Sequence, residues 1–161
     1  MSRLALVLIL GGPPEVLAKV IDKFRPEMVS YLICEEGLRR MGEMVKMLAH
    51  RPLITQNIVV SDYEDLLACY EAADRCLEVT RKEGFAIKDT IVDLSGGTTP
   101  SMIAGMVAAG APLGYKFHAL KDPAKRRQAL YPLFRKEEEA FLHEKFAKKM
   151  FLAELKQAAL L

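Results

Sequence analysis

Glycines, threonines and a serine stand together in the middle of the chain, in the order Ser95-Gly96-Gly97-Thr98-Thr99-Pro100. Glycines let the backbone turn sharply and let a ligand approach it closely. The threonine hydroxyls come where a helix would begin, and the unpaired amides of a first helical turn favour an anion. All five residues before the proline are therefore candidate ligands of a phosphate, a ribose or a base edge. A plain strand-to-helix turn with Thr98 as N-cap is the alternative that the spacing alone favours.

Other residues of this chemistry follow the other apolar segments. We expect Gly11, Gly12 and Ser61 to bind the same ligand, because each follows an apolar run of its own. Glu35 and Glu36 follow another such run, where a solvated turn is the better interpretation because carboxylates repel phosphates. A basic cluster suited to covering a polyanion comes later in the chain, although a solvated charged turn fits it equally well. Its members are Lys121, Lys125, Arg126 and Arg127; of these, Arg126 is a predicted ligand-binding residue.

Several kinds of site are disfavoured. The chain has no G-x-G-x-x-G after its first apolar run and no G-x-x-x-x-G-K-[ST], which argues against a dinucleotide cofactor and a P-loop. The three histidines show no metal-ligand spacing, so we expect no metal and no cofactor, and a structural role for His118. Cys34, Cys69 and Cys76 are odd in number and lack CxxC spacing, which predicts buried free thiols in a reducing cytoplasm.

The elements that position these residues alternate along the chain. Continuous apolar runs over residues 4–10, 28–34, 54–60, 90–94 and 115–120 predict strands. Amphipathic segments between them predict helices, the third of which would begin at a capping box over Ser61 to Glu64. Such alternation predicts an α/β fold, a Rossmann-like three-layer sandwich with a mainly parallel sheet of five or six strands. Residues 135–161 predict a C-terminal amphipathic helix.

Length and charge limit the organisation of the chain. Its 161 residues suit a Rossmann-like domain over residues 1–120, followed by a basic segment and helix over 121–161 that pack on the domain or on a dimer. The run over residues 4–10 is too short to cross a membrane, and no later segment reaches that length. The net charge of +2 means that any binding of phosphates depends on the local placement of a few groups.

The segment DLSGGTTPSM, residues 93–102, resembles the D-x-[ST]-G-G-T-K-x-M signature of CRISPR-associated Rossmann-fold domains. It departs from that signature at Thr99 and Pro100, where lysine and a small residue are usual, and Met102 comes one position later. The resemblance implies a homodimer that binds a cyclic oligoadenylate, with cyclic tetra-adenylate expected, across its two-fold axis in type III CRISPR antiviral signalling. A ring of even symmetry suits such an isologous interface.

Three functions remain open at this stage. The first is a sensor that only binds the ring, for which the family implies a C-terminal effector domain outside this chain as a further partner. The second is a metal-independent ring nuclease, in which the protein aligns a ribose 2′-hydroxyl with the neighbouring phosphate. Thr98, Thr99 and Lys121 would then be catalytic, with Ser95 or Arg126 assisting. The third is an unrelated α/β regulator that binds another nucleotide.

Overall fold

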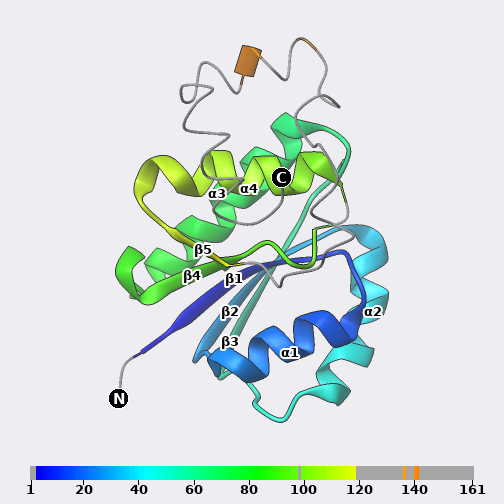
Figure 1. Cartoon of the computed structure of the whole chain (residues 1–161), viewed down its shortest axis with the longest axis vertical. Coiled ribbons are helices and arrows are strands. Elements are labelled where there is room, and N and C mark those ends of the chain that lie inside the picture. The colour runs from blue at the N-terminus through cyan, green and yellow to red at the C-terminus, as the bar shows by residue number, and fades with distance from the viewer. Residues whose placement is uncertain (1–2, 98, 119–135, 137–139, 142–161) are drawn as a thin grey trace.

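The computed structural model describes residues 3–97, 99–118, 136 and 140–141. It confirms the expected α/β fold, because five parallel strands form one sheet in the order β3-β2-β1-β4-β5 (Figure 1). The strands are β1 (Ala5–Leu10), β2 (Met28–Ile33), β3 (Ile54–Val59), β4 (Thr90–Asp93) and β5 (Lys116–His118). The chain winds outward from β1 to β3, then returns to the other side of β1 to form β4.

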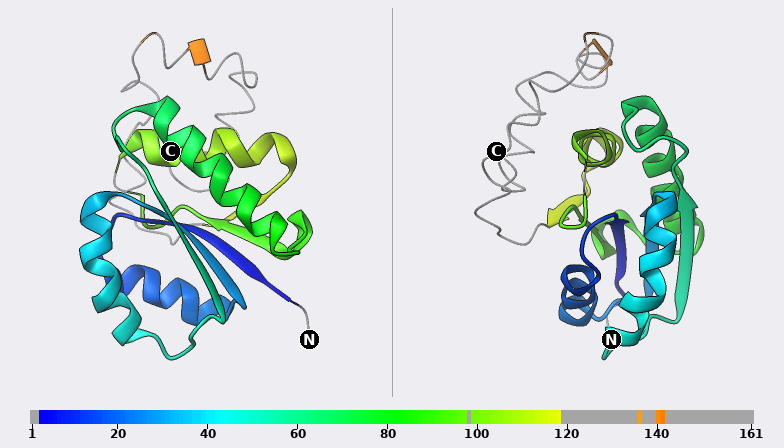
Figure 2. Two further views of the ribbon diagram at one scale, coloured as in Figure 1. Left: turned by 180° about the vertical axis from the view of Figure 1, so that it is seen from behind. Right: turned by 90° about the vertical axis from the view of Figure 1, so that its right-hand side faces the viewer.

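Four helices cover the two faces of the sheet. They are α1 (Pro14–Phe24), α2 (Glu35–Met47), α3 (Leu66–Lys82) and α4 (Pro100–Gly110). Alternate residues of β1 enter two separate apolar cores: Leu6 and Leu8 pack with α1 and α2, whereas Val7 and Ile9 pack with α3 and α4. The right-hand view of Figure 2 shows α1 and α3 on opposite sides of β1. The two cores and the sheet between them make the three layers that the sequence predicts.

Helix α4 is buried on all sides, from Ser101 to Gly110. A helix that is apolar around its whole circumference needs such an environment. At Gly105 an added Cβ would lie 2.8 Å from the backbone nitrogen of Tyr70, so this glycine lets the backbones of α3 and α4 approach closely. The close packing holds the first turn of α4 at the carboxyl edge of the sheet.

Two local predictions are wrong. Ser61 and Glu64 do not form a capping box, because α3 begins later and Asp65 is its N-cap, accepting a hydrogen bond from the Ala68 amide at 2.9 Å. Glu35 to Gly37 form the first turn of α2 and not a free turn. A Cβ on Gly37 would lie 2.4 Å from the carbonyl oxygen of Leu10, so glycine lets this helix start against the end of β1.

Some predictions fall outside the described residues. They concern Thr98, Lys121, Arg126 and most of the segment 121–161, of which residues 136, 140 and 141 are described and helical. Phe141 packs edge-on against Tyr70 of α3, with ring centroids 5.1 Å apart. In the described part of the chain no helix is long and apolar enough to cross a membrane. Nor do three metal-ligating side chains gather anywhere in that part.

Candidate functional site

The two glycine turns of the sequence meet at the carboxyl edge of the sheet. Strand order reverses between β1 and β4, and ligands of open α/β sheets bind in the crevice at such a switch point. The amide of Gly11, after β1, donates to the carbonyl of Gly96, after β4, at 3.2 Å. Gly11, Gly12, Ser95, Gly96 and Gly97, all of them buried, therefore form one corner, which we call the glycine corner.

The glycines of this corner differ in what they do. A Cβ on Gly96 would lie 2.0 Å from the carbonyl oxygen of Ile9, and one on Gly97 would lie 2.4 Å from the Ile103 side chain. Packing alone therefore requires glycine at these two positions. A Cβ on Gly12 would meet its nearest neighbour, the carbonyl oxygen of Gly96, at an ordinary 3.6 Å. Gly12 is thus the one of the three that the fold does not demand.

The start of α1 supplies hydrogen-bond donors beside the corner. Pro13 is its N-cap residue and offers no side-chain hydrogen bond to the first turn. Within the described residues no acceptor binds the amide of Gly12. Uncapped amides at a helix N-terminus favour an anion. The start of α4 is different, because the Thr99 hydroxyl caps it by accepting from the Met102 amide at 3.3 Å.

Arg40 adds a positive charge that the sequence analysis missed. Its guanidinium Nη1 donates to the carbonyl of Gly11 at 3.1 Å and to that of Gly12 at 3.4 Å. The signal was available, since Arg40 follows Gly37 by three residues on α2 and so lies on the same helix face. Arg40 therefore brings a cation to a corner whose turn carries threonine and proline where the signature has lysine and a small residue.

Thr99 links the turn after β4 to the loop after β3. Its hydroxyl donates to the carbonyl of Tyr63 at 2.5 Å, and the Ser101 hydroxyl donates to the carbonyl of Glu64 at 2.9 Å. Thr99, not Thr98, is the N-cap of α4. Ser61 lies exposed at the end of β3, separated from the glycine corner by β2. The structure thus joins Thr99 to the Ser61 loop, while Ser61 itself stays away from the corner.

The edge beside Ser61 is negatively charged. The nearby carboxylates, Glu36 first and then Glu64, raise the pKa of the Tyr63 hydroxyl above its ordinary value. Asp62 adds to the same effect. A phosphate is therefore repelled at the ends of β2 and β3 and is better placed at the glycine corner, beside Arg40.

A buried carboxylate joins the corner to the end of β5. Asp93 is fully buried and accepts hydrogen bonds from the Ser95 amide at 3.0 Å and the Ser95 hydroxyl at 3.1 Å. Its Oδ2 also lies 2.6 Å from Nδ1 of His118, whose Nε2 lies 3.2 Å from the ammonium nitrogen of Lys23. A carboxylate only accepts and an ammonium only donates, so both neighbours favour the neutral tautomer with the proton on Nδ1.

This dyad is the second feature that sequence reasoning missed, since it gave His118 a structural role. The strand ends carried the signal, because β4 and β5 pair in parallel with Asp93 opposite His118. An imidazole oriented by a carboxylate through Nδ1 presents the lone pair of Nε2 as a general base. The described part of the chain therefore holds a proton acceptor one residue away from Ser95 of the corner, through Asp93.

No family model matches the chain, and no curated protein matches it. Two solved structures share its fold. One is described as a UDP-N-acetylglucosamine 2-epimerase from Listeria monocytogenes, with a TM-score of 0.53, 16% identity, and coverage of 99% of this chain and 44% of that one. The other is Enterococcus italicus Csm6 bound to cyclic hexa-2′-fluoro-hexa-dAMP, with a TM-score of 0.54, 12% identity, and coverage of 92% and 40%. The chain spans less than half the length of either protein. What they share with it is the Rossmann-like fold.

Proposed function

We propose that the chain binds a cyclic oligoadenylate, with cyclic tetra-adenylate the expected ring, at the glycine corner of a homodimer in type III CRISPR antiviral signalling. The observation that carries the proposal is the corner itself, where the Gly12 amide, the uncapped start of α1 and the Arg40 guanidinium converge at the switch point. Two further points support it: the signature-like segment 93–102, and the fold shared with a Csm6 that is bound to a cyclic oligonucleotide analogue.

The proposed binding uses groups that recognise phosphate and base without reading a long sequence. Amides at the start of α1 and the Arg40 guanidinium take phosphate oxygens. The acidic edge at Glu36 and Glu64 keeps the phosphates at the corner and leaves room there for adenine amino groups, which donate to carboxylates. Two corners that face each other across a two-fold axis match a ring of even symmetry.

A matched pair of glycine variants tests the proposal. Gly12→Ala adds a methyl group at the corner without a steric clash, whereas Gly42→Ala adds one on α2 where no atom lies within 4 Å. Calorimetry with cyclic tetra-adenylate should show binding to the wild type and to Gly42→Ala. Binding to Gly12→Ala should be weaker by about tenfold or more, which corresponds to ~1.4 kcal/mol.

The same experiment separates the alternatives. Linear tetra-adenylate should bind more weakly than the ring, and light scattering should show a dimer in the complex. Tighter binding of UDP-N-acetylglucosamine than of the ring would favour an unrelated nucleotide-binding regulator. A complex with one chain per ring, or wild-type affinity in Gly12→Ala, would contradict the proposed site.

A metal-independent ring nuclease is the second candidate, and the Asp93–His118 dyad favours it. Nε2 of His118 would take the proton of a ribose 2′-hydroxyl as its oxygen forms a bond to the adjacent phosphorus. The bond from phosphorus to the 5′-oxygen would break, leaving a 2′,3′-cyclic phosphate, and the Lys23 ammonium would protonate the departing oxygen. Thr98, Thr99 and Lys121 remain predicted catalytic residues of this reaction.

Cleavage is tested apart from binding. Labelled ring incubated with protein in EDTA should yield linear products ending in a 2′,3′-cyclic phosphate. His118→Gln should slow their formation by about 10²-fold to 10⁴-fold, the usual contribution of a general base, while ring affinity stays within error. An intact ring after long incubation would leave a sensor, and an unchanged rate in His118→Gln would exclude the dyad as base.

A further inference from the structure

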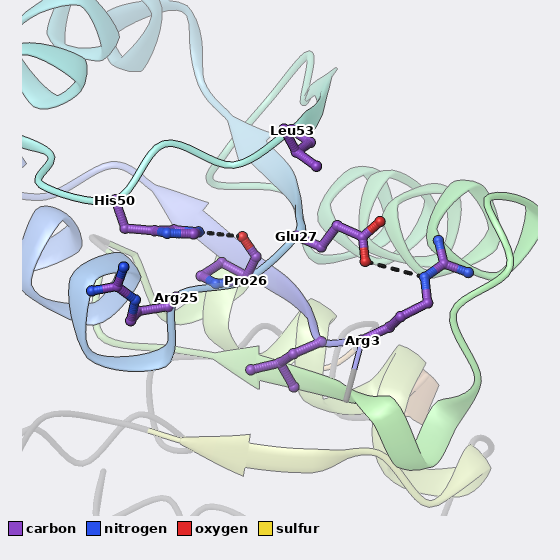
Figure 3. Close-up of a pocket in the computed structure, with 7 residues that line it drawn as sticks. Arg3, Arg25, Pro26, Glu27, His50 and Leu53 are labelled. Carbon is purple, nitrogen blue, oxygen red and sulfur yellow. Dashed lines mark hydrogen bonds and ion pairs between the residues drawn. The ribbon is translucent and has the colours of Figure 1, made fainter. Parts of the chain in front are cut away.

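A second pocket lies at the opposite edge of the sheet, where β1, β2 and β3 begin (Figure 3). Its volume is about 670 Å³, and its lining residues are Arg3, Leu4, Arg25, Pro26, Glu27, His50 and Leu53. Pockets that hold small molecules span about 300–1,000 Å³. The proposed function uses none of these residues, because the glycine corner lies at the carboxyl edge.

The walls of this pocket are fixed by backbone hydrogen bonds. The Glu27 amide donates to the carbonyl of Leu4 at 2.8 Å, and the Glu27 carbonyl accepts from the Leu53 amide at 2.9 Å. The carboxylate of Asp22 on α1 accepts from the His50 amide at 2.9 Å, which holds the loop after α2. Three segments that are distant in sequence are thus joined, and the pocket is preformed.

The two arginines of the pocket are in different electrostatic situations. Nε of Arg3 pairs with the Glu27 carboxylate at 3.1 Å, and its guanidinium stacks over the Phe85 ring at 4.4 Å. Within the described residues Arg25 has no acidic partner. Figure 3 shows Arg25 and His50 on one side of the pocket and the Arg3–Glu27 pair on the other. The Arg25 side therefore carries an unbalanced positive charge.

The backbone of Arg25 is a second, independent observation. Arg25 ends α1 with φ 48° and ψ 54°, the left-handed region, and no other non-glycine residue in the described part of the chain has a positive φ. This position usually takes glycine or asparagine, because a Cβ is disfavoured there. Lys23 already supplies a cation to the last turn of α1. An unfavourable backbone conformation that keeps an arginine in a pocket points to a use for its side chain.

We propose that this pocket binds a small organic anion, with a phosphate or carboxylate group on Arg25 and an apolar body against Leu4, Pro26 and Leu53. A guanidinium pairs with either oxyanion through two parallel hydrogen bonds. Leu53 is 83% exposed and Pro26 is buried, so the apolar wall runs from the floor of the pocket to its rim. Nε2 of His50 lies 2.7 Å from the Pro26 carbonyl and donates to it, which holds the ring beside Arg25.

Titration of the full chain with phenyl phosphate and with benzoate, followed by ¹H–¹⁵N spectra, tests this proposal. One or both probes should give saturable shifts at the amides of Arg25, Glu27 and His50, and the stronger probe identifies the oxyanion. Inorganic phosphate should bind more weakly, because it lacks the apolar body. Arg25→Gly suits the left-handed backbone and so retains the fold, but it should weaken binding by about tenfold or more.

The control is Arg51→Gln, which removes the same charge beside His50 from a residue that does not line the pocket. Its affinity should equal that of the wild type. Wild-type affinity in Arg25→Gly would overturn the proposal, as would an equal loss in both variants, which would indicate a general effect of charge. Absence of saturable shifts with both probes, or shifts confined to Gly12 and the glycine corner, would also overturn it.

Discussion

Replacing Asp93 with asparagine should destabilise the fold by removing a buried acceptor from three hydrogen bonds. Asparagine keeps one carbonyl oxygen, which can still accept from the Ser95 amide, but its NH₂ group replaces the oxygen that faces the Ser95 hydroxyl and His118 Nδ1. His118 would then have to move its proton to Nε2, which faces the Lys23 ammonium at 3.2 Å. Two donors would oppose each other there.

The size of the effect follows from these contacts. Loss of a short charge-assisted hydrogen bond costs about 1.5–3 kcal/mol, and an unsatisfied buried donor adds about 1–3 kcal/mol. The relief from no longer burying a charge offsets part of this. We therefore expect Asp93→Asn to lower the free energy of unfolding by about 2–4 kcal/mol, which is a fall of roughly 4–16 °C in Tm for a chain of this size.

Urea unfolding at neutral pH measures the loss, and long-range ¹H–¹⁵N spectra of the imidazoles report the tautomer of His118. The wild type should carry the proton on Nδ1 and the variant on Nε2. Glu78→Gln is a suitable control, since it removes a carboxylate that is exposed and pairs only with Lys82 on the same helix. A loss below about 0.5 kcal/mol, the usual range of surface substitutions, or an Nε2–H tautomer in the wild type, would refute this account of the dyad.

Three further predictions concern the core. Thr80 donates to the carbonyl of Cys76 and so accepts from Ser30 at 2.7 Å; Thr80→Val should cost about 1–3 kcal/mol in urea unfolding, and adding Ser30→Ala should recover much of it. Gly96→Ala should cost more than 3 kcal/mol, beyond ordinary overpacking at about 1–3, and spectra like those of the wild type would contradict the clash with Ile9. Burial raises the pKa of Cys76 to about 12, so the unfolded chain releases this proton first as pH rises above about 9, and stability should fall toward pH 12 by as much as ~4 kcal/mol; Cys76→Ala should remove that part of the pH dependence, measured by urea unfolding.

Much of the fold was predictable because its signals are local. The apolar run of β1 and the alternation of strands and helices indicate a parallel sheet with both faces covered, whatever the details of packing. The glycine corner was predictable for the same reason: Gly11 and Gly96 each follow a predicted strand, and the carboxyl ends of parallel strands share one edge. What the local pattern does not contain is that Gly96 is demanded by the carbonyl of Ile9, a contact made through the strand order.

The residues that were missed depend on pairings between distant segments. Arg40 reaches the corner because Gly37 lets α2 approach the end of β1, and His118 meets Asp93 because β5 pairs with β4 in one particular register. The wrong capping box has a similar cause. Ser61 and Glu64 satisfy the local pattern, but the loop is held by Thr99 and Ser101 of α4, and the helix begins only after it.

The direction of the helices explains why the two proposed anion sites are built differently. Each helix here runs antiparallel to the strands, so its N-terminus lies at the carboxyl edge and its C-terminus at the opposite edge. At the glycine corner backbone amides already favour an anion, and Arg40 only reinforces them. At the opposite edge the ends of α1 and α2 present carbonyls, which repel an anion. A pocket for an anion at that edge therefore has to use side-chain cations, which is the role proposed for Arg25.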